Sequence, residues 1–171
     1  LETVPADHVF QIEKESLGET GDNGLLVGEK WKRDEFIRFM LLTSSNDAIH
    51  EIALETGKLI DPETLDPVKT FVTRMNERAK EMNLRSFVFH NESGLDLETE
   101  PIQNGAYSNA RDMVKLFAHA VQNYKDMFSI TSNKTATISS FDAEHVGENT
   151  NPLVQEIPGL LASKTGFTNA S

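Results

Sequence analysis

Residues 33–57, RDEFIRFMLLTSSNDAIHEIALETG, contain two apolar patterns of helical period, separated by a short polar segment. Apolar side chains recur on one helix face before the segment, and a second set recurs in the same way after it. The first set is Phe36, Ile37, Met40 and Leu41, and the second is Ala48, Ile49, Ile52 and Ala53. The stretch therefore predicts two consecutive helices, with Asp34 capping the first and Gly57 ending the second.

Two more helices are expected further along the chain. One begins after an Asp-Pro pair, at residues 61–62 or 66–67, and reaches about Met82. The other follows a cap at Ser108 or Asn109. The residues on or near its buried face are expected to be Met113, Val114, Leu116, Phe117 and Ala120.

Strand-like runs are short and few. They lie at residues 9–12, 86–91, 133–140 and 159–167, whereas residues 92–108 and 141–152 have the composition of loops. So few runs do not make a good sheet alone. Either they pair with one another, or strands from outside the chain complete the sheet.

Composition excludes several kinds of function. The apolar share of 38% and charged share of 25% are those of a folded protein, one domain or part of a larger one. The net charge of −11 disfavours nucleic-acid binding, because phosphate recognition needs clustered Lys and Arg. There is no cysteine, which excludes disulfides and a thiol nucleophile. Histidines and carboxylates lack metal-ligand spacing, so we expect no metal and no cofactor.

Two tripeptides carry side chains suited to catalysis or binding. Ser44-x-Asn46 lies at the start of the second helix, where such residues also serve as caps. A hydroxyl and an amide at this place can relay a proton and bind a substrate amide. In Lys164-Thr165-Gly166, Lys offers a charge for a carboxylate, Thr a donor, and Gly room for a ligand backbone. Taken alone, each is explained more simply by capping or by an ordinary strand end.

Together the tripeptides belong to the motif set of penicillin-binding proteins and serine β-lactamases: Ser-x-x-Lys, Ser-x-Asn and Lys-Thr-Gly. The surrounding sequence resembles the D-alanyl-D-alanine carboxypeptidase family, the low-molecular-mass penicillin-binding proteins. The resembling stretches are LLVGEKWKRDEFIRFMLLTSSNDAIHEIALETG, FVTRMNERAKEMNLRSFVFHNESGLD, YSNARDMVKLFAHAV and NTNPLVQEIPGLLASKTGFTNAS. The chain departs from the family at three places. It has Glu92-Ser93 where the family favours a Pro, Phe167 where Tyr or His is more usual, and Ser45 where Gly or Ala is common.

The resemblance implies an α+β, mostly helical fold. This is the helical lobe plus a small β part of the penicillin-binding protein/serine β-lactamase (DD-peptidase) fold, with an incomplete sheet. Residues 1–171 would form a partial transpeptidase-like domain, truncated at both ends. No Ser in the chain has a Lys three positions later, so the family's nucleophile and its base are absent from it. We therefore expect the chain to be inactive alone.

The resemblance also implies a role for each site residue. Ser44 would help pass a proton to the departing D-alanine, and Asn46 would bind the substrate's amide carbonyl. Lys164 and Thr165 would engage the terminal carboxylate.

The last two site residues would act through the backbone. Gly166 would let the substrate lie beside this edge as an added strand. The N–H of Phe167 would contribute to an oxyanion hole.

The implied function is a serine-type D-Ala-D-Ala carboxypeptidase that acts on peptidoglycan stem peptides through an acyl-enzyme. Its ligands would be a pentapeptide ending in D-Ala-D-Ala and β-lactams. Two alternatives remain: a non-catalytic peptidoglycan-peptide-binding or interaction module, and a serine β-lactamase. Uncovered strand edges predict a strand-paired homo-oligomer. We expect an extracytoplasmic location, in the periplasm or at the cell surface and membrane-associated in the full-length form, although this chain has no signal peptide or anchor.

Overall fold

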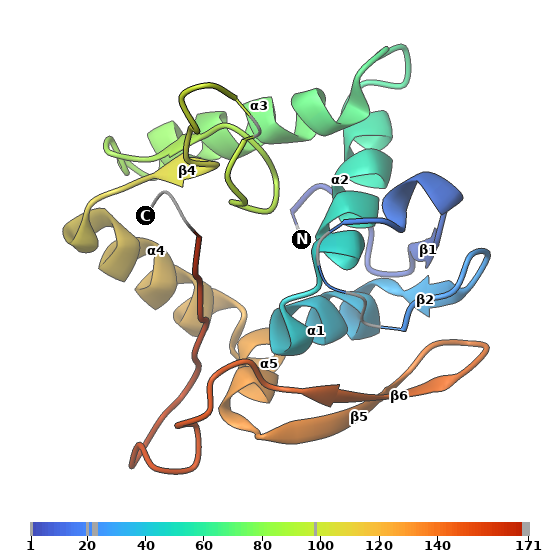
Figure 1. The fold of residues 1–171 in the computed structure, drawn as a ribbon, viewed down its shortest axis with the longest axis vertical. Coiled ribbons are helices and arrows are strands. Elements are labelled where there is room, and N and C mark those ends of the chain that lie inside the picture. The colour runs from blue at the N-terminus through green and yellow to red at the C-terminus, as the bar shows by residue number, and fades with distance from the viewer. Residues whose placement is uncertain (1, 20, 22–23, 98, 169–171) are drawn as a thin grey trace. The chain divides into compact units, whose positions relative to one another are not determined.

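The computed structural model describes residues 2–19, 21, 24–97 and 99–168. The helices are α1 (Arg33–Thr43), α2 (Asn46–Ile60), α3 (Pro67–Glu81), α4 (Ala110–Asn123) and α5 (Lys125–Phe128), with 3-10 turns η1 (Lys14–Ser16) and η2 (Ser129–Ser132) (Figure 1). The strands are β1 (Val9–Gln11), β2 (Lys30–Lys32), β3 (Val88–Phe89), β4 (Ala106–Tyr107), β5 (Thr135–Ser139) and β6 (Glu144–Glu148). The chain is α+β and mostly helical, as predicted. None of the described helices combines the length and hydropathy needed to cross a bilayer.

The described strands form three two-stranded antiparallel ladders, β1–β2, β3–β4 and β5–β6. The expectation of a strand at residues 159–167 was wrong: this segment lies outside the ladders of the described residues. A strand needs a hydrogen-bonded neighbour, and no described segment pairs with this one. Strands β4 and β6 lie in stretches expected to be loops, so that expectation was wrong at residues 106–107 and 144–148. In β6 the inward positions are His145 and Gly147, so the strand shows no apolar alternation.

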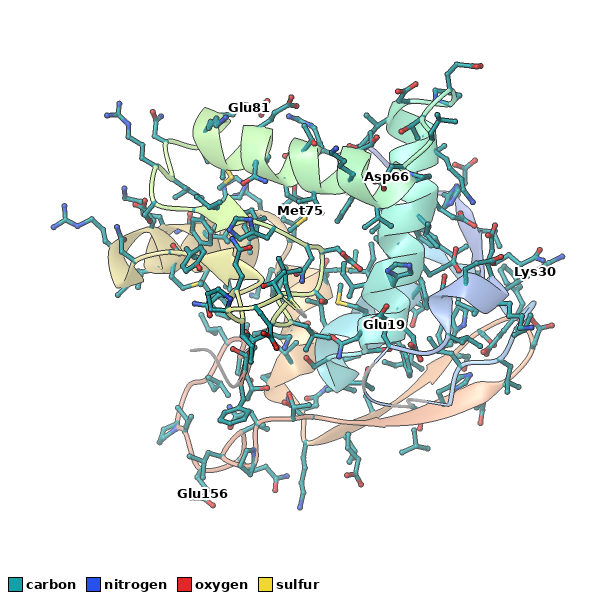
Figure 2. The ribbon with its side chains drawn as sticks, turned by 45° about the horizontal axis from the view of Figure 1, so that its top comes forward. Glu19, Lys30, Asp66, Met75, Glu81 and Glu156 are labelled. Atoms are coloured by element: carbon teal, nitrogen blue, oxygen red, sulfur yellow. The ribbon has the colours of Figure 1, made fainter. Side chains whose placement is uncertain are left out.

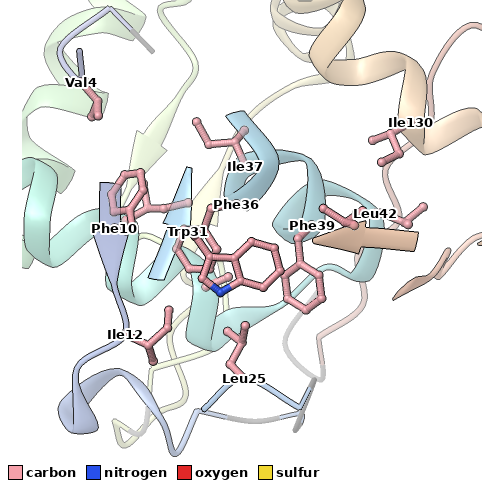
Figure 3. Packing of buried hydrophobic residues seen from close by; sticks show 13 residues of the cluster. Val4, Phe10, Ile12, Leu25, Trp31, Phe36, Ile37, Phe39, Leu42 and Ile130 are labelled. Carbon is pink, nitrogen blue, oxygen red and sulfur yellow. The ribbon is translucent and has the colours of Figure 1, made fainter. Parts of the chain in front are cut away.

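The chain divides into two compact units. Unit 1 contains the described residues of Leu1–Ile52 and Ala120–Thr165, and unit 2 those of Ala53–His119 and Gly166–Ser171. The core of unit 1 joins β1, β2 and α1 through aromatic side chains. The largest fully buried ones are Trp31, Phe10, Phe36 and Phe39 (Figure 3).

The caps of α1 and α2 differ from those expected from the sequence. The N-cap of α1 is Lys32, and Asp34 lies inside the first turn, where it accepts a hydrogen bond from Arg33 Nε at 2.6 Å. Ser44 ends α1 in the left-handed conformation, with φ 57° and ψ 39°. The buried Ser45 then caps α2, because its Oγ accepts the amide of Ala48 at 3.1 Å.

Gly57 does not end α2, which continues to Ile60. A Cβ built on Gly57 would lie 1.9 Å from the carbonyl oxygen of Pro67, so glycine is needed for a close backbone approach. The second Asp-Pro pair is the one that starts α3: Asp66 accepts the Lys69 amide at 3.0 Å, with Pro67 at the first helical position. Figure 2 shows Asp66 and Glu81 at opposite ends of this helix.

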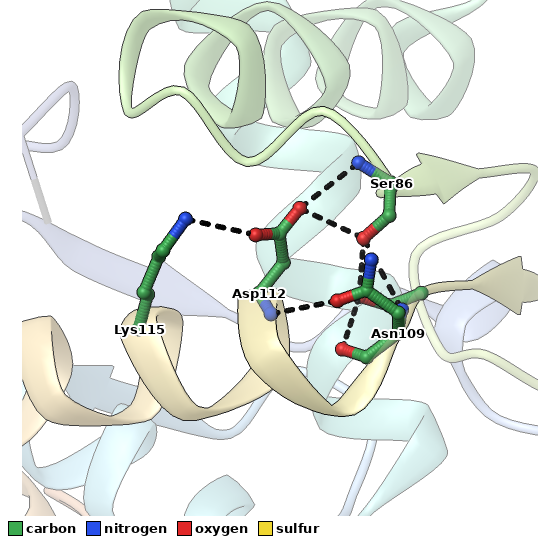
Figure 4. Close-up of polar contacts among 5 residues, drawn as sticks. Ser86, Asn109, Asp112 and Lys115 are labelled. Carbon is green, nitrogen blue, oxygen red and sulfur yellow. Dashed lines mark hydrogen bonds and ion pairs between the residues drawn. The ribbon is translucent and has the colours of Figure 1, made fainter.

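Unit 2 has a smaller apolar cluster and an additional polar network. The buried apolar residues of the cluster are Ala79, Leu84 and Phe87. Asn109 caps α4 by accepting the Asp112 amide at 2.9 Å (Figure 4). The expectation that Met113 and Val114 lie on the buried face was wrong, since both are exposed. Asp112 is buried on α4 instead, because its carboxylate accepts two hydrogen bonds from Ser86.

Candidate active site

Ser44 and Lys164, 120 residues apart in the sequence, are joined by a direct hydrogen bond. Lys164 Nζ donates to Ser44 Oγ at 2.6 Å and to the carbonyl oxygen of Thr165 at 2.7 Å. All three residues belong to unit 1. The structure therefore brings together the first residue of one predicted motif and the first two of the other.

The backbone at the helix junction presents the Ser44 hydroxyl. The left-handed conformation of Ser44 breaks the α1 path at this residue, immediately before α2 starts at Asn46. Because Ser45 provides the cap of α2, the hydroxyl of Ser44 is used for the contact with Lys164. Capping thus explains the middle residue of the Ser-x-Asn motif and not its first. Asn46, the first residue of α2, lies two positions from Ser44.

The amine of Lys164 is held by two oxygen acceptors. Burial lowers the pKa of the Lys164 ammonium from its ordinary value. A protonated amine here can attract a carboxylate, and its hydrogen bond to Ser44 provides a direct path for a proton between the two side chains. The pair can therefore perform both anion binding and proton transfer.

Asn46 also groups with unit 1, and so does Thr165. Its hydroxyl forms a hydrogen bond with the hydroxyl of Thr150. Gly166 and Phe167 follow directly in the chain but group with unit 2. A Cβ at Gly166 would meet open space, and the Phe167 side chain is 87% exposed. The proposed roles of these two residues stay predictions from the sequence.

Sequence reasoning missed the residues that hold the Lys164 segment. Ser163 makes two hydrogen bonds to Thr131 of η2, one through its amide and one through its hydroxyl, each at 2.9 Å. Ser163 adjoins the predicted motif, which was the available signal for it. Thr131 lies in a short 3-10 turn in which three of the four residues carry hydroxyls, a pattern that also occurs in ordinary loops.

The described residues contain no group of three or more side chains of the kinds that bind a metal ion. The side chains of Ser44, Asn46, Lys164 and Thr165 offer hydroxyls, an amide and one amine.

Residues 9–171 match the model of the peptidase S11 family, D-alanyl-D-alanine carboxypeptidase. Among curated proteins, the chain is 31% identical over 149 residues to the D-alanyl-D-alanine carboxypeptidase DacB2 of Mycobacterium tuberculosis, covering 86% of this chain and 46% of that protein. It is 29% identical to the D-alanyl-D-alanine carboxypeptidase DacF of Bacillus subtilis, covering 82% of this chain and 33% of DacF. The chain thus spans less than half the length of these relatives.

Solved structures show the same fold. A D-alanyl-D-alanine carboxypeptidase from Mycobacterium tuberculosis H37Rv matches with a TM-score of 0.78 and 25% identity, over 99% of this chain and 59% of that one. The Streptomyces K15 DD-transpeptidase matches with a TM-score of 0.78 and 23% identity, over 98% and 64%. These matches confirm the predicted DD-peptidase fold. Because the family match covers nearly the whole sequence, the chain belongs to the D-alanyl-D-alanine carboxypeptidase family, peptidase S11.

Proposed function

We propose that this chain provides two walls of the active site of a serine-type D-Ala-D-Ala carboxypeptidase. The observation that carries the proposal is the hydrogen bond of 2.6 Å between Lys164 Nζ and Ser44 Oγ. It joins the Ser-x-Asn and Lys-Thr-Gly motifs, which are weak signals separately and specific when they meet. Membership of the S11 family supports the same assignment.

Each proposed role uses a property of the side chain. Ser44 relays a proton toward the departing D-alanine, with Lys164 as its hydrogen-bond partner. Asn46 binds the amide carbonyl of the substrate. Lys164 and Thr165 hold the terminal carboxylate, which would explain a requirement for a free C-terminus.

The remaining roles belong to the backbone. Gly166 leaves room for the substrate to lie alongside as an added strand, consistent with the open space around its α-carbon. The N–H of Phe167 donates to the oxyanion, an interaction that contributes on the order of 3 kcal/mol in serine proteases.

The nucleophile comes from a Ser-x-x-Lys segment that these 171 residues do not contain. The missing Ser attacks the carbonyl carbon of the terminal D-Ala-D-Ala bond, and D-alanine leaves with the proton passed through Ser44. Water then hydrolyses the acyl-enzyme. We also propose that residues 1–171 belong to one transpeptidase-like domain.

The proposed substrate is a peptidoglycan pentapeptide ending in D-Ala-D-Ala, and β-lactams would occupy the same site as its mimics. Such a substrate places the enzyme outside the cytoplasm, in the periplasm or at the cell surface, and we propose membrane association for the full-length form. The catalysed reaction needs no metal or cofactor.

Fluorescent penicillin tests the assignment of the nucleophile. The 171-residue chain should form no stable adduct, because it has no Ser-x-x-Lys motif. A protein whose gene encodes this motif in frame before these residues should be labelled, and Lys164→Ala should lower the labelling rate. Labelling of the 171-residue chain itself, or unchanged labelling of the Lys164→Ala protein, would contradict the proposal.

A non-catalytic module that binds peptidoglycan peptides is the second candidate. It would use Ser44 and Lys164, which the structure joins, for binding alone. Both candidates predict weak binding of N-acetyl-D-Ala-D-Ala to the chain, with a Kd of about 1 mM or weaker. They differ in the gene: an upstream in-frame Ser-x-x-Lys supports the enzyme, and a gene without one supports the binding module.

We further propose that the chain alone forms strand-paired homo-oligomers. Each described strand has a single neighbour, so backbone donors and acceptors remain along the outer edges of the ladders. Native mass spectrometry should detect dimers or larger species. A monomer across the accessible concentration range would contradict this.

A further inference from the structure

The segment that carries Lys164 is attached to unit 1 by side-chain hydrogen bonds rather than by a ladder. Residues 160–168 lie outside the described strands. Ser163 donates its amide to Thr131 Oγ1 and its hydroxyl to the Thr131 carbonyl oxygen, each at 2.9 Å. Ala162, next to Ser163, is buried. The attachment is therefore immediately before Lys164 in the chain.

Thr131 is buried, and its hydroxyl has a fixed direction. Thr131 Oγ1 donates to the carbonyl oxygen of Phe128 at 2.7 Å, which uses its single proton. A lone pair of the same oxygen is then left to accept the amide of Ser163. The hydroxyl thus links the backbone near η2 to the backbone of the Lys164 segment, with no freedom to rotate without losing a bond.

Asn149 extends this attachment to the end of β6. Its side-chain Nδ2 donates to the carbonyl oxygens of Thr131, at 2.7 Å, and Asn133, at 2.9 Å. Its backbone N–H donates to the Lys134 carbonyl oxygen at 2.8 Å. The carbonyl of Thr131 therefore accepts from both Asn149 and Ser163. We call Thr131, Asn149 and Ser163 the Thr131 cluster.

We propose that Thr131 is a positioning residue that holds Lys164 within hydrogen-bonding reach of Ser44, an inference that rests on the proposed function of that pair. Consecutive α-carbons are 3.8 Å apart, so a displacement of Ser163 carries over to Lys164. The contact between Lys164 Nζ and Ser44 Oγ at 2.6 Å is lost after a shift of about 1 Å. Thr131 acts at one step removed, through Ser163, and touches neither the substrate nor the reacting atoms.

The test compares four variants of the 171-residue chain by NMR. Thr131→Val keeps the shape and removes the hydroxyl, whereas Thr131→Ser keeps the hydroxyl. Ser132→Ala is the matched control, because the Ser132 hydroxyl donates within η2, to the Ser129 carbonyl oxygen at 2.7 Å. Ser44→Ala provides the reference signal of Lys164 without its partner.

In Thr131→Val, the Ser163 amide should exchange with solvent at least about tenfold faster, while amides of β1 and β2 keep their rates. The side-chain signal of Lys164 should move to its position in Ser44→Ala. Thr131→Ser and Ser132→Ala should both match the unmodified chain. Unchanged Ser163 exchange, an unmoved Lys164 signal, or equal acceleration of the β1 and β2 amides would each overturn the proposal.

If Thr131→Val does not fold, Ser163→Ala decides the question. It removes the bond from the Ser163 hydroxyl to the Thr131 carbonyl and leaves Thr131 intact. The same displacement of the Lys164 signal is expected, and its absence would overturn the proposal.

Titration with N-acetyl-D-Ala-D-Ala separates this proposal from the proposed function. If the unmodified chain binds the dipeptide, Thr131→Val should weaken binding at least about threefold while Ser132→Ala should not, and equal affinities would overturn the positioning role. If the unmodified chain does not bind it, the carboxylate-binding function fails. Exchange at Ser163 and the Lys164 signal still decide whether Thr131 positions Lys164.

Discussion

The two units differ in the size of their apolar cores. In unit 1 the core is aromatic, and Trp31, Phe10 and Phe36 are completely buried. In unit 2 the apolar cluster has three buried members, and buried polar groups such as Asp112 supply further contacts between its elements. Unit 1 buries hydrogen-bonded carboxylates as well, among them Glu29, so the units differ in apolar packing and not in whether they bury charge. We therefore expect the largest losses from changes to the aromatic core of unit 1, whereas single polar contacts weigh more in unit 2, whose apolar cluster is small.

The candidate site lies on the more strongly packed side of this comparison. Ser44 ends the helix whose Phe36, Phe39 and Leu42 enter the aromatic core. A Cβ at Gly147 of β6 would come within 2.9 Å of Thr43, so β6 also packs closely against the last turn of α1. The end of α1 is therefore packed against the aromatic core and against β6. This packing holds Ser44 in one position, as a proton relay requires.

Trp31→Ala should have the largest effect. The side chain is fully buried and contacts the rings of Phe36, Phe39 and His145 at centroid distances of 4.9–5.5 Å. The lost packing should lower the free energy of unfolding by about 3–5 kcal/mol. Chemical denaturation, monitored by circular dichroism, measures this free energy of unfolding.

Leu26→Ala is the control for this change, because Leu26 is exposed at 61% and should alter stability by less than about 0.5 kcal/mol. A loss in Trp31→Ala no larger than that of the control would show that the aromatic cluster does not dominate unit 1.

Asn76→Ala should be next, and should act on unit 2. The Asn76 amide pairs with both backbone groups of Phe89: Nδ2 donates to its carbonyl at 2.9 Å, and Oδ1 accepts its N–H at 2.9 Å. Removing it leaves partly buried backbone groups without partners, at a cost of about 1–3 kcal/mol. Exchange of the Phe89 amide should accelerate accordingly.

Thr73→Ala on the same helix is the control, since its exposed hydroxyl donates to the Lys69 carbonyl of its own helix. If the Phe89 amide exchanged at the same rate in Asn76→Ala and Thr73→Ala, the side chain of Asn76 would not be the group that joins α3 to β3.

Helices were predictable from the sequence because their signals are local. The two sets of apolar residues in 33–57 indicated α1 and α2, and α3 starts at the second of the two Asp-Pro pairs that were left open, residues 66–67. The end of α2 was not predictable. Glycine is typical of a helix end, but Gly57 lacks a side chain because the Pro67 backbone lies close to it. A contact of this kind between two elements leaves no local pattern in the sequence.

Strands were predicted less well, because their pairing is not local. The inward His145 of β6 forms a hydrogen bond of 2.6 Å with the buried Glu29, so a polar pair takes the place of an apolar one. The apolar run at 159–167 has the composition of a strand but no described partner. The meeting of Ser44 and Lys164 followed from the family resemblance, and neither tripeptide alone would have predicted it.

Acid should destabilise unit 2 through Asp112. The Ser86 backbone N–H, the Ser86 hydroxyl and the Lys115 ammonium lower the pKa of Asp112 to about 2, from 3.8 (Figure 4). A carboxyl whose pKa is lower in the folded state stabilises it above the unfolded pKa and loses this contribution as the pH falls. The loss should therefore occur between about pH 4 and pH 2.

Asp112→Asn should reduce stability at pH 7 and flatten this part of the pH dependence, measured through exchange of the Ser86 amide and through thermal unfolding. Glu63→Gln, at an exposed residue of the same unit, should keep the slope of the unmodified chain. A slope that survives in Asp112→Asn would assign the acid sensitivity to other carboxylates.

Glu81→Gln should have the smallest effect and marks the limit of the polar contribution in unit 2. Glu81 accepts hydrogen bonds from Arg74 at 2.7 Å and Arg78 at 3.1 Å, and these lower its pKa, but all three side chains are largely solvated. The carboxylate also lies in the last turn of α3, where the helix dipole disfavours negative charge. Attraction to the two arginines and repulsion from the helix end oppose each other, and water screens both.

The melting temperature of Glu81→Gln should therefore equal that of the unmodified chain at both low and high salt. A loss as large as that of Asp112→Asn would mean that exposed ion pairs, and not buried carboxylates, stabilise unit 2.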